Sequence, residues 1–106
     1  LLLHIIQLMK TERPYLRSDL KVGDIAGMVG ASQRAVSDCI KIVQGCSFTH
    51  FINTYRIDYA KLLMRQQPDI KITEVYIRSG FANEASFYRT FKTITGLTPR
   101  EWAKND

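Results

Sequence analysis

Hydrophobic residues recur at helical spacing through most of this chain, with polar residues between them. The longest such stretch runs from Ser47 to Gln67, where apolar and aromatic side chains repeat every three or four positions. The repeating positions are Phe48, Phe51, Ile52, Tyr55, Tyr59, Leu62 and Leu63. Ser47 is expected to cap the first turn, and Pro68 to end the helix because proline has no N–H to donate. The pattern therefore predicts one long central helix with a single apolar face.

Shorter helices are expected on both sides of this central stretch. Before it, the pattern predicts helices over residues 1–11, 22–29 and 32–44, and residues 15–21 connect the first two. After it, helices are expected over residues 73–79 and 83–95, and a last turn begins at Pro99 and carries Trp102. No segment alternates with period two for long enough to form a convincing strand. The expected fold is all-α, with about seven helices.

The segments before and after the central helix share one sequence pattern, as in an internal repeat. Four glycines mark equivalent turns and helix ends, at spacings of fifty and fifty-one positions: Gly30 with Gly80, and Gly45 with Gly96. Apolar residues expected to face a core match as well: Val36, Ile40 and Val43 with Phe87, Phe91 and Ile94. A short helix, a glycine turn and a longer helix make a helix-turn-helix. We expect residues 1–46 and 68–106 to be helix-turn-helix subdomains and residues 47–67 to be the helix that links them.

The outward faces of the two longer helices carry short polar residues and arginine. Opposite the core triplet, the first helix should expose Arg34, Asp38 and Lys41, with Ser37 at the edge. By the same construction the second should expose Ala85, Arg89 and Lys92, flanked by Ser86, Tyr88 and Thr93. A DNA major groove accepts such faces, because Arg binds guanine bidentately and Ser or Thr can donate or accept. The linking helix would span roughly 30 Å, close to the ~34 Å of one DNA turn, which favours double-stranded DNA over a plain solvated surface.

The composition allows this function without requiring it. The 106 residues are 45% hydrophobic, enough to fold, and 15 Lys and Arg against 10 Asp and Glu give a net charge of +5. Residues 1–46 contribute +2 and the remainder +3, so positive charge is spread over both halves. A basic balance suits a polyanionic partner, but many small basic proteins bind no nucleic acid.

Features of other protein classes are missing from the sequence. Cys39 and Cys46 provide neither a disulfide framework nor a metal-ligand spacing, and Cys39 is expected to be a small buried thiol. His4 and His50 are isolated, and no carboxylate pair or nucleophile elbow occurs, so we expect no enzyme, cofactor or metal site. No apolar run reaches the ~20 residues of a membrane span, so no membrane partner is expected. A reducing cytoplasm is the expected compartment.

A series of motifs with specific spacing runs from Tyr55 to Trp102. Arg56 and Ala60 fit an R-x-x-x-A pattern, and residues 71–81 read KITEVYIRSGF. Residues 87–92 then read FYRTFK, and residues 96–102 read GLTPREW. This series resembles the signature of the AraC/XylS family of transcription regulators, I-x-E-I-A…G-F followed by S-x-F-x-R-x-F-K…G-x-x-P. The first half is similar more loosely, through residues 24–26, 30–32, 40 and 45, so the resemblance covers about residues 22–102.

The resemblance implies a seven-helix DNA-binding domain whose two recognition helices, about 32–44 and 83–95, enter successive major-groove segments on one face of the DNA. If the family's DNA-contacting positions are transferred to this sequence, bases or nearby phosphates would be reached from positions 34, 37, 38, 84, 85, 86 and 89. With the residues found from the pattern, the expected DNA-binding set is Ser32, Arg34, Ser37, Asp38, Lys41, Asn83, Glu84, Ala85, Ser86, Arg89, Lys92 and Thr93. Regulators of this family usually carry a sensing or dimerising region elsewhere. The chain begins without Met, and we expect it to be part of a larger regulator.

Four positions depart from the family's pattern: Asp38, Tyr76, Glu84 and Ala85. A carboxylate can accept from cytosine but is repelled by phosphates, so Asp38 indicates less base reading by the first recognition helix. Gly27 lies inside the short helix before it and should make that half softer. The two acids and an exposed Ile42 also leave an alternative, a helical module that docks on RNA polymerase or a partner subunit.

Overall fold

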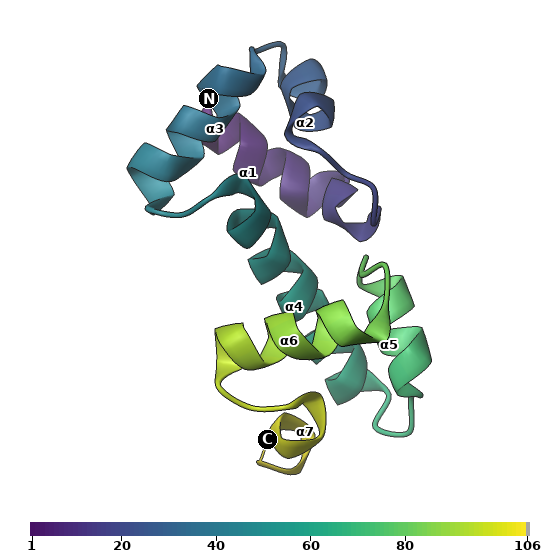
Figure 1. Cartoon of the computed structure of the whole chain (residues 1–106). Coiled ribbons are helices and arrows are strands. Elements are labelled where there is room, and N and C mark those ends of the chain that lie inside the picture. Colours follow the sequence, from purple (N-terminus) through teal and green to yellow (C-terminus); the bar gives the residue numbers. More distant parts are fainter. Residues whose placement is uncertain (106) are drawn as a thin grey trace.

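Seven α-helices make up the computed structural model, which describes residues 1–105 (Figure 1). They are α1 (Leu2–Thr11), α2 (Val22–Val29), α3 (Gln33–Cys39), α4 (Phe48–Gln66), α5 (Ile72–Arg78), α6 (Glu84–Thr95) and α7 (Pro99–Asn105). A 3₁₀ turn, η1 (Pro14–Leu16), lies between α1 and α2, and a π-helix, η2 (Ile40–Gln44), continues α3. No strand occurs within residues 1–105, which confirms the all-α prediction. Asp106, the last residue of the expected second subdomain, lies outside the described residues.

The central helix α4 is unbroken, and the other helices gather around its two ends. Ser47 caps it as predicted, since its hydroxyl oxygen accepts a hydrogen bond from the His50 N–H at 3.1 Å. In Figure 1, α1, α2 and α3 lie around the start of α4, whereas α5, α6 and α7 lie around its end. The molecule is correspondingly elongated and measures 41 × 23 × 22 Å. None of the described helices is long and apolar enough to cross a membrane.

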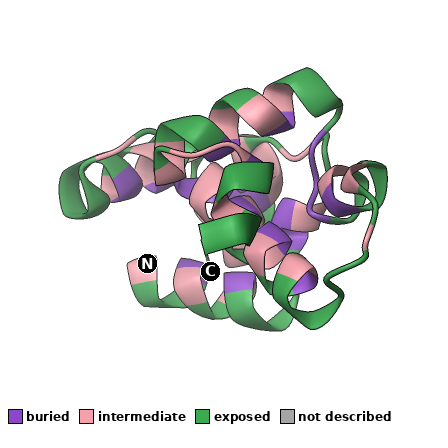
Figure 2. Cartoon of the chain, turned by 90° about the horizontal axis from the view of Figure 1, so that it is seen from below, coloured by how far each residue is buried: buried purple, intermediate pink, exposed green. Residues whose placement is uncertain are grey.

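Two separate hydrophobic cores form along α4. The first is made by Ile5, Met9, Tyr15, Ile25, Ala26, Val36, Ile40, Phe51 and Ile52. The second is made by Ile57, Ala60, Val75, Phe81, Phe87 and Phe91. Figure 2 shows these buried residues on the helix faces that point inward, and exposed residues on the outer faces. Tyr15 is buried, and both Leu16 and Leu20 pack against the first core.

The prediction of a single apolar face on α4 is wrong. Leu62, expected on that face, is 43% exposed, whereas Ile57 and Ala60 are completely buried. Counting roughly 100° per residue, Ala60 lies on the side of the helix opposite Phe51. The reason is that α4 contributes to two cores in succession. Its first half buries the Phe51 side, and its second half buries the side of Ile57 and Ala60.

The prediction for the end of the first recognition helix is also wrong in two details. Val36 and Ile40 are fully buried as expected, but Val43 is 60% exposed. Beyond Cys39 the chain forms a π-helix, in which hydrogen bonds join residues five apart. The side chain of the third residue after Ile40 therefore no longer returns to the face that packs on the core. Cys39 is half-buried rather than buried, because it lies at the edge of that face.

Arg56, in the middle of α4, joins the two halves. Its Nε donates to the carbonyl oxygen of Tyr15 at 2.6 Å, and its Nη2 donates to that of Arg17 at 2.8 Å. Its Nη1 donates to Asn53 at 3.3 Å, and its guanidinium carbon lies 5.9 Å from the ring centroid of Phe81. Burial lowers the pKa of Arg56 from its ordinary value, but an arginine stays charged at any physiological pH. One charged side chain thus contacts the η1 segment of the first half and the α5–α6 turn of the second.

Gly80 makes room for this junction. Its φ of 94° lies in the left-handed region, which side chains other than glycine rarely adopt. A Cβ added there would collide with the carbonyl oxygen of Tyr15 and lie 3.0 Å from both Arg56 Nε and Leu16 Cα. The turn between α5 and α6 therefore packs directly on the backbone of the first half.

We predict that Arg56→Met lowers the free energy of unfolding by about 2–3 kcal/mol, because the carbonyls of Tyr15 and Arg17 lose a charged donor in a partly buried place. Urea denaturation followed by circular dichroism measures the change. Arg78→Met, at an exposed position on α5, is the matched control and should change stability by less than about 0.5 kcal/mol. Equal stability of the two variants would show that the junction contributes nothing.

Candidate nucleic-acid interface

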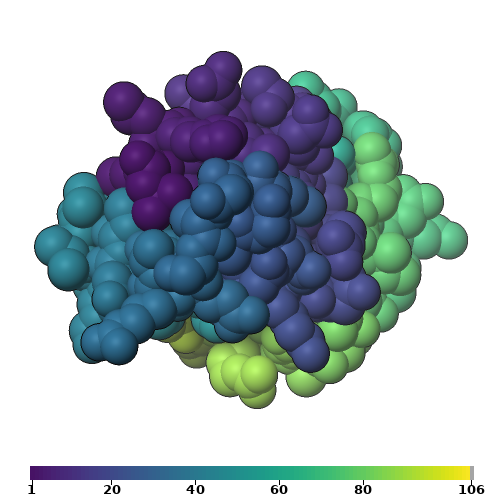
Figure 3. All heavy atoms as spheres, turned by 90° about the horizontal axis from the view of Figure 1, so that it is seen from above, coloured from purple at the N-terminus to yellow at the C-terminus, as the bar shows by residue number. Residues whose placement is uncertain are grey.

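The two predicted recognition helices lie on the same side of the molecule. In Figure 1, α3 and α6 both run from the right to the left of the view, with α3 near the start of α4 and α6 near its end. Seen from above in Figure 3, α1 forms the opposite edge from the blue-to-teal surface of α3 and η2 and from the yellow-green end of α6. The fold therefore offers two similarly directed helices, spaced along α4, to one extended partner.

Side-chain caps fix where each recognition helix starts. The Ser32 hydroxyl oxygen accepts from the Ala35 N–H at 3.0 Å, and the Asn83 side-chain oxygen accepts from the Ser86 N–H at 2.8 Å. Gly45 and Gly96 end the two helical segments at φ of 71° and 80°. Ser32 and Asn83 are exposed, but each already uses its oxygen within its own helix. Both keep a donor for a partner, the hydroxyl O–H of Ser32 and the side-chain N–H₂ of Asn83.

The outward face of α3 carries a pair of opposite charges. Arg34, Asp38 and Lys41 are exposed, and Ser37 is half-buried at the edge, as predicted. Arg34 Nε lies 3.6 Å from a carboxylate oxygen of Asp38, and the two side chains are 91% and 57% exposed. Such an exposed i,i+4 pair is worth a few tenths of a kcal/mol, so roughly that much would be lost when Arg34 turns to another partner.

The outward face of α6 also carries two basic residues and one acid. Glu84, Ala85, Arg89, Lys92 and Thr93 are exposed, whereas Ser86 is half-buried. The Thr93 hydroxyl donates to the Arg89 carbonyl at 2.9 Å, so it is engaged within the helix. Glu84 lies in the first turn, where the helix dipole favours a negative charge. Among residues 1–105, Arg89 forms no ion pair, unlike Arg34.

Lys92 lies at the end of α6 near the start of α7. Hydrogen bonds from the backbone and side chain of Thr98 and, as a smaller cause, the charge of Lys92 hold the pKa of Glu101 below its ordinary value. Glu101 therefore stays ionised over the physiological range and attracts Lys92 only weakly, because both side chains are exposed. Lys92 remains available to an anionic partner.

Two residues with a part in this arrangement were missed by pattern reasoning. Gln33, exposed as the first residue of α3, lies so close to α2 that a Cβ on Gly23 would be 2.8 Å from its Nε2. Arg56 fitted a motif, but its role in joining the halves came only from the structure. The available signal was an arginine in the middle of α4, next to the buried Ile57. Within the described part of the chain, no group of three His, Cys, Asp or Glu could hold a metal ion.

A family model described as a helix-turn-helix domain matches residues 25–105. The chain belongs to the AraC-type helix-turn-helix domains. Among solved structures, this AraC-type domain is similar to a transcriptional regulator from Chromobacterium violaceum with an AraC-type DNA-binding domain. That match has 26% identity and a TM-score of 0.77, and covers 92% of this chain and 83% of that one. It also resembles the DNA-binding domain of AdpA, solved in complex with a target DNA, with 18% identity, a TM-score of 0.81 and coverage of 98% and 90%.

A helix-turn-helix-type transcriptional regulator from Staphylococcus aureus is 36% identical over 88 residues, which are 83% of this chain and 12% of the relative. The AraC-type domain thus spans about an eighth of the length of that relative. The family assignment confirms the predicted resemblance, and with it the prediction of a sequence-specific DNA-binding domain of a transcription regulator.

We predict that Asn83→Ala lowers the free energy of unfolding by about 1 kcal/mol, because the Ser86 N–H loses its cap, whereas Asn83→Asp keeps that acceptor and most of the stability. Thermal and urea unfolding of the two variants and the wild type measure this. An alanine variant as stable as the aspartate variant would mean that the cap is unimportant, leaving Asn83 as a contact residue alone.

Proposed function

We propose that α3 and α6 enter successive major-groove segments on one side of a DNA duplex. The observation that carries this proposal is that both helices lie on one side of an unbroken α4 and run in the same direction. A helix of 19 residues spans roughly 28 Å, which places α3 and α6 within about one turn of DNA of each other. The similarity in fold to the AdpA domain, which was solved in complex with a target DNA, supports a DNA partner for this fold.

Base discrimination should come mainly from α6. Arg89 is exposed and without an ion pair among residues 1–105, so its guanidinium can bind guanine O6 and N7 bidentately. Arg34 can make the same contact only after leaving Asp38. Ser37, Glu84, Ala85 and Ser86 lie beside these arginines and would shape the contact, whereas Ser32 and Thr93 act through the helices they stabilise.

Affinity that does not depend on sequence should come from the lysines. Lys41 and Lys92 are exposed beyond the arginines on their helices, where phosphates would flank a helix lying in the groove. Each lysine that neutralises a phosphate releases a counterion and steepens the dependence of affinity on salt. The two lysines would thus fix the register of the domain on the duplex, while the arginines would discriminate between bases.

A second surface favours a protein partner next to the DNA. Ile42 and Val43, consecutive on η2, are 81% and 60% exposed. RNA polymerase is the partner we propose for this apolar pair, within a larger cytoplasmic regulator that contains this domain. Exposed apolar side chains of this kind add nothing to contact with a phosphate backbone, which favours a protein as their partner.

We predict that Arg89→Ala weakens binding to a cognate duplex about 10–100-fold, since a bidentate base contact is worth roughly 1–3 kcal/mol, and weakens binding to random duplex much less. Cognate sites selected from a random duplex pool provide the target for a gel-shift comparison. An equal loss on both duplexes would make Arg89 a phosphate contact.

We predict the reverse for Lys92→Ala: all duplex sequences should bind more weakly, and the slope of log affinity against log salt should fall by about 1. Fluorescence anisotropy at several salt concentrations measures the slope. Lys104→Ala, near the end of α7, serves as the matched control. A slope as steep in Lys92→Ala as in the control would contradict the assignment of Lys92 to a phosphate.

A further inference from the structure

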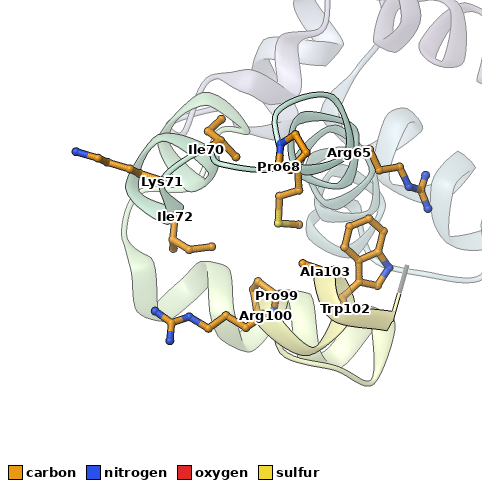
Figure 4. A pocket seen from close by; sticks show the side chains of 10 residues that line it. Arg65, Pro68, Ile70, Lys71, Ile72, Pro99, Arg100, Trp102 and Ala103 are labelled. Carbon is orange, nitrogen blue, oxygen red and sulfur yellow. The ribbon is translucent and has the colours of Figure 1, made fainter.

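A hollow of about 700 Å³ lies between the end of α4, the start of α5 and α7 (Figure 4). Its apolar lining consists of Met64, Pro68, Ile70, Ile72, Pro99, Trp102 and Ala103. This volume falls within the roughly 300–1,000 Å³ of small-molecule sites. The hollow is formed by the second half alone and includes none of the residues assigned to DNA.

Trp102 gives the hollow a fixed aromatic wall. Its ring meets the edge of Phe91 from the second core, with ring centroids 6.0 Å apart. The guanidinium carbon of Arg65 lies 4.9 Å from the centre of the Trp102 ring, and Lys61 Nζ lies 5.9 Å from it. A ring held on several sides offers a ligand a large contact area with little loss of conformational entropy.

The charged residues that line the hollow are all positive. They are Arg65, Lys71 and Arg100. Arg65 is occupied at Trp102, whereas Lys71 and Arg100 are exposed and form no ion pair within residues 1–105. In Figure 4 both side chains extend outward from the hollow, Lys71 at the upper left and Arg100 at the lower left, so each would turn inward to meet a ligand. The acids closest in sequence to Lys71, Asp69 and Glu74, do not line this hollow; they line a smaller neighbouring one, which Lys71 also borders.

We propose that this hollow binds a small organic acid with an aromatic or branched aliphatic body. The body would lie against Trp102, Met64 and Ile72, where apolar surface is removed from water. The carboxylate would lie at the rim, where the long side chains of Lys71 and Arg100 can turn to donate charge-assisted hydrogen bonds. A neutral analogue would gain only the apolar contact, and a cationic analogue would be repelled by all three positive side chains.

The chain provides its own reporter for this site. Trp102 is its single tryptophan, so tryptophan emission reports on the wall of the hollow alone. Phenylacetate, phenylacetamide and phenethylammonium carry the same ring and differ in charge. Titration with phenylacetate should change the emission saturably, with an affinity about tenfold above that of the amide, and phenethylammonium should give no saturable change.

Three variants test separately the positive charge at the rim, the space inside the hollow and the non-specific effect of a substitution on α7. Lys71→Glu combined with Arg100→Glu should lower the phenylacetate affinity by about tenfold or more, because both partners of the carboxylate become repulsive. Ala103→Phe, which fills the hollow, should weaken binding of every analogue. Lys104→Glu on the same helix lies outside the lining and should bind phenylacetate like the wild type. Circular dichroism checks that each variant is folded.

Several results would overturn this proposal. Equal responses to the three compounds, or unchanged phenylacetate affinity in the charge-reversed variant, would reduce the binding to non-specific apolar contact. An emission that no compound changes would show that the hollow takes no such ligand. A response to the peptide acetyl-Asp-Phe-Glu-amide without one to phenylacetate would make the hollow a protein-docking site and would equally contradict a small acid as its ligand.

Discussion

The guanidinium of Arg56 fixes how the two halves of this domain face the same partner. Its contacts with the carbonyls of Tyr15 and Arg17 reach the first half, and its position over Phe81 reaches the second. The rod α4 alone would set the distance between the halves, but not their rotation around its axis. A planar group with several donors holds two carbonyls in fixed directions, whereas a lysine ammonium at the end of a flexible stem imposes no such geometry. Because Gly80 has no side chain, the α5–α6 turn can pack against the same place.

Neither half is large enough to bury a large hydrophobic core, and the two small cores differ in composition. The first core is largely aliphatic, but the hydroxyl-bearing rings of Tyr15 and Tyr55 stack at its edge with centroids 5.5 Å apart. Burial raises the pKa of both tyrosines, so both remain neutral at physiological pH. In the second core Phe87 meets Phe81 and Phe91 edge to face, at 5.3 Å and 5.7 Å. Large rings fill a core with few residues, which suits a second core of six buried residues against nine in the first.

Local features of this fold could be predicted from the sequence because they depend on neighbours in the chain. The Ser47 and Asn83 caps, the glycine helix ends and the exposure of Arg34 and Arg89 all follow from short-range patterns. The features that the sequence did not reveal depend on distant partners. Arg56 and Tyr15 are 41 positions apart, and no periodicity encodes that contact. The exposed Val43 and the two buried faces of α4 likewise follow from which helices pack around them, and not from spacing within one helix.

The two proposed recognition helices differ in how freely their arginines could contact bases. The Arg34–Asp38 pair is exposed and worth a few tenths of a kcal/mol, whereas a bidentate arginine–guanine contact is worth roughly 1–3 kcal/mol. Arg34 can therefore leave Asp38 for a guanine, but Asp38 then stays beside the DNA and disfavours phosphates close to it. On α6 the acid is Glu84 in the first turn, Arg89 forms no ion pair within residues 1–105, and the helix is regular to its end. In the proposed arrangement Arg56 holds both helices in one frame, so binding of α6 to its groove segment would bring α3 to the next segment already oriented. Even weak base preference there adds to specificity, because no further loss of orientational freedom accompanies it.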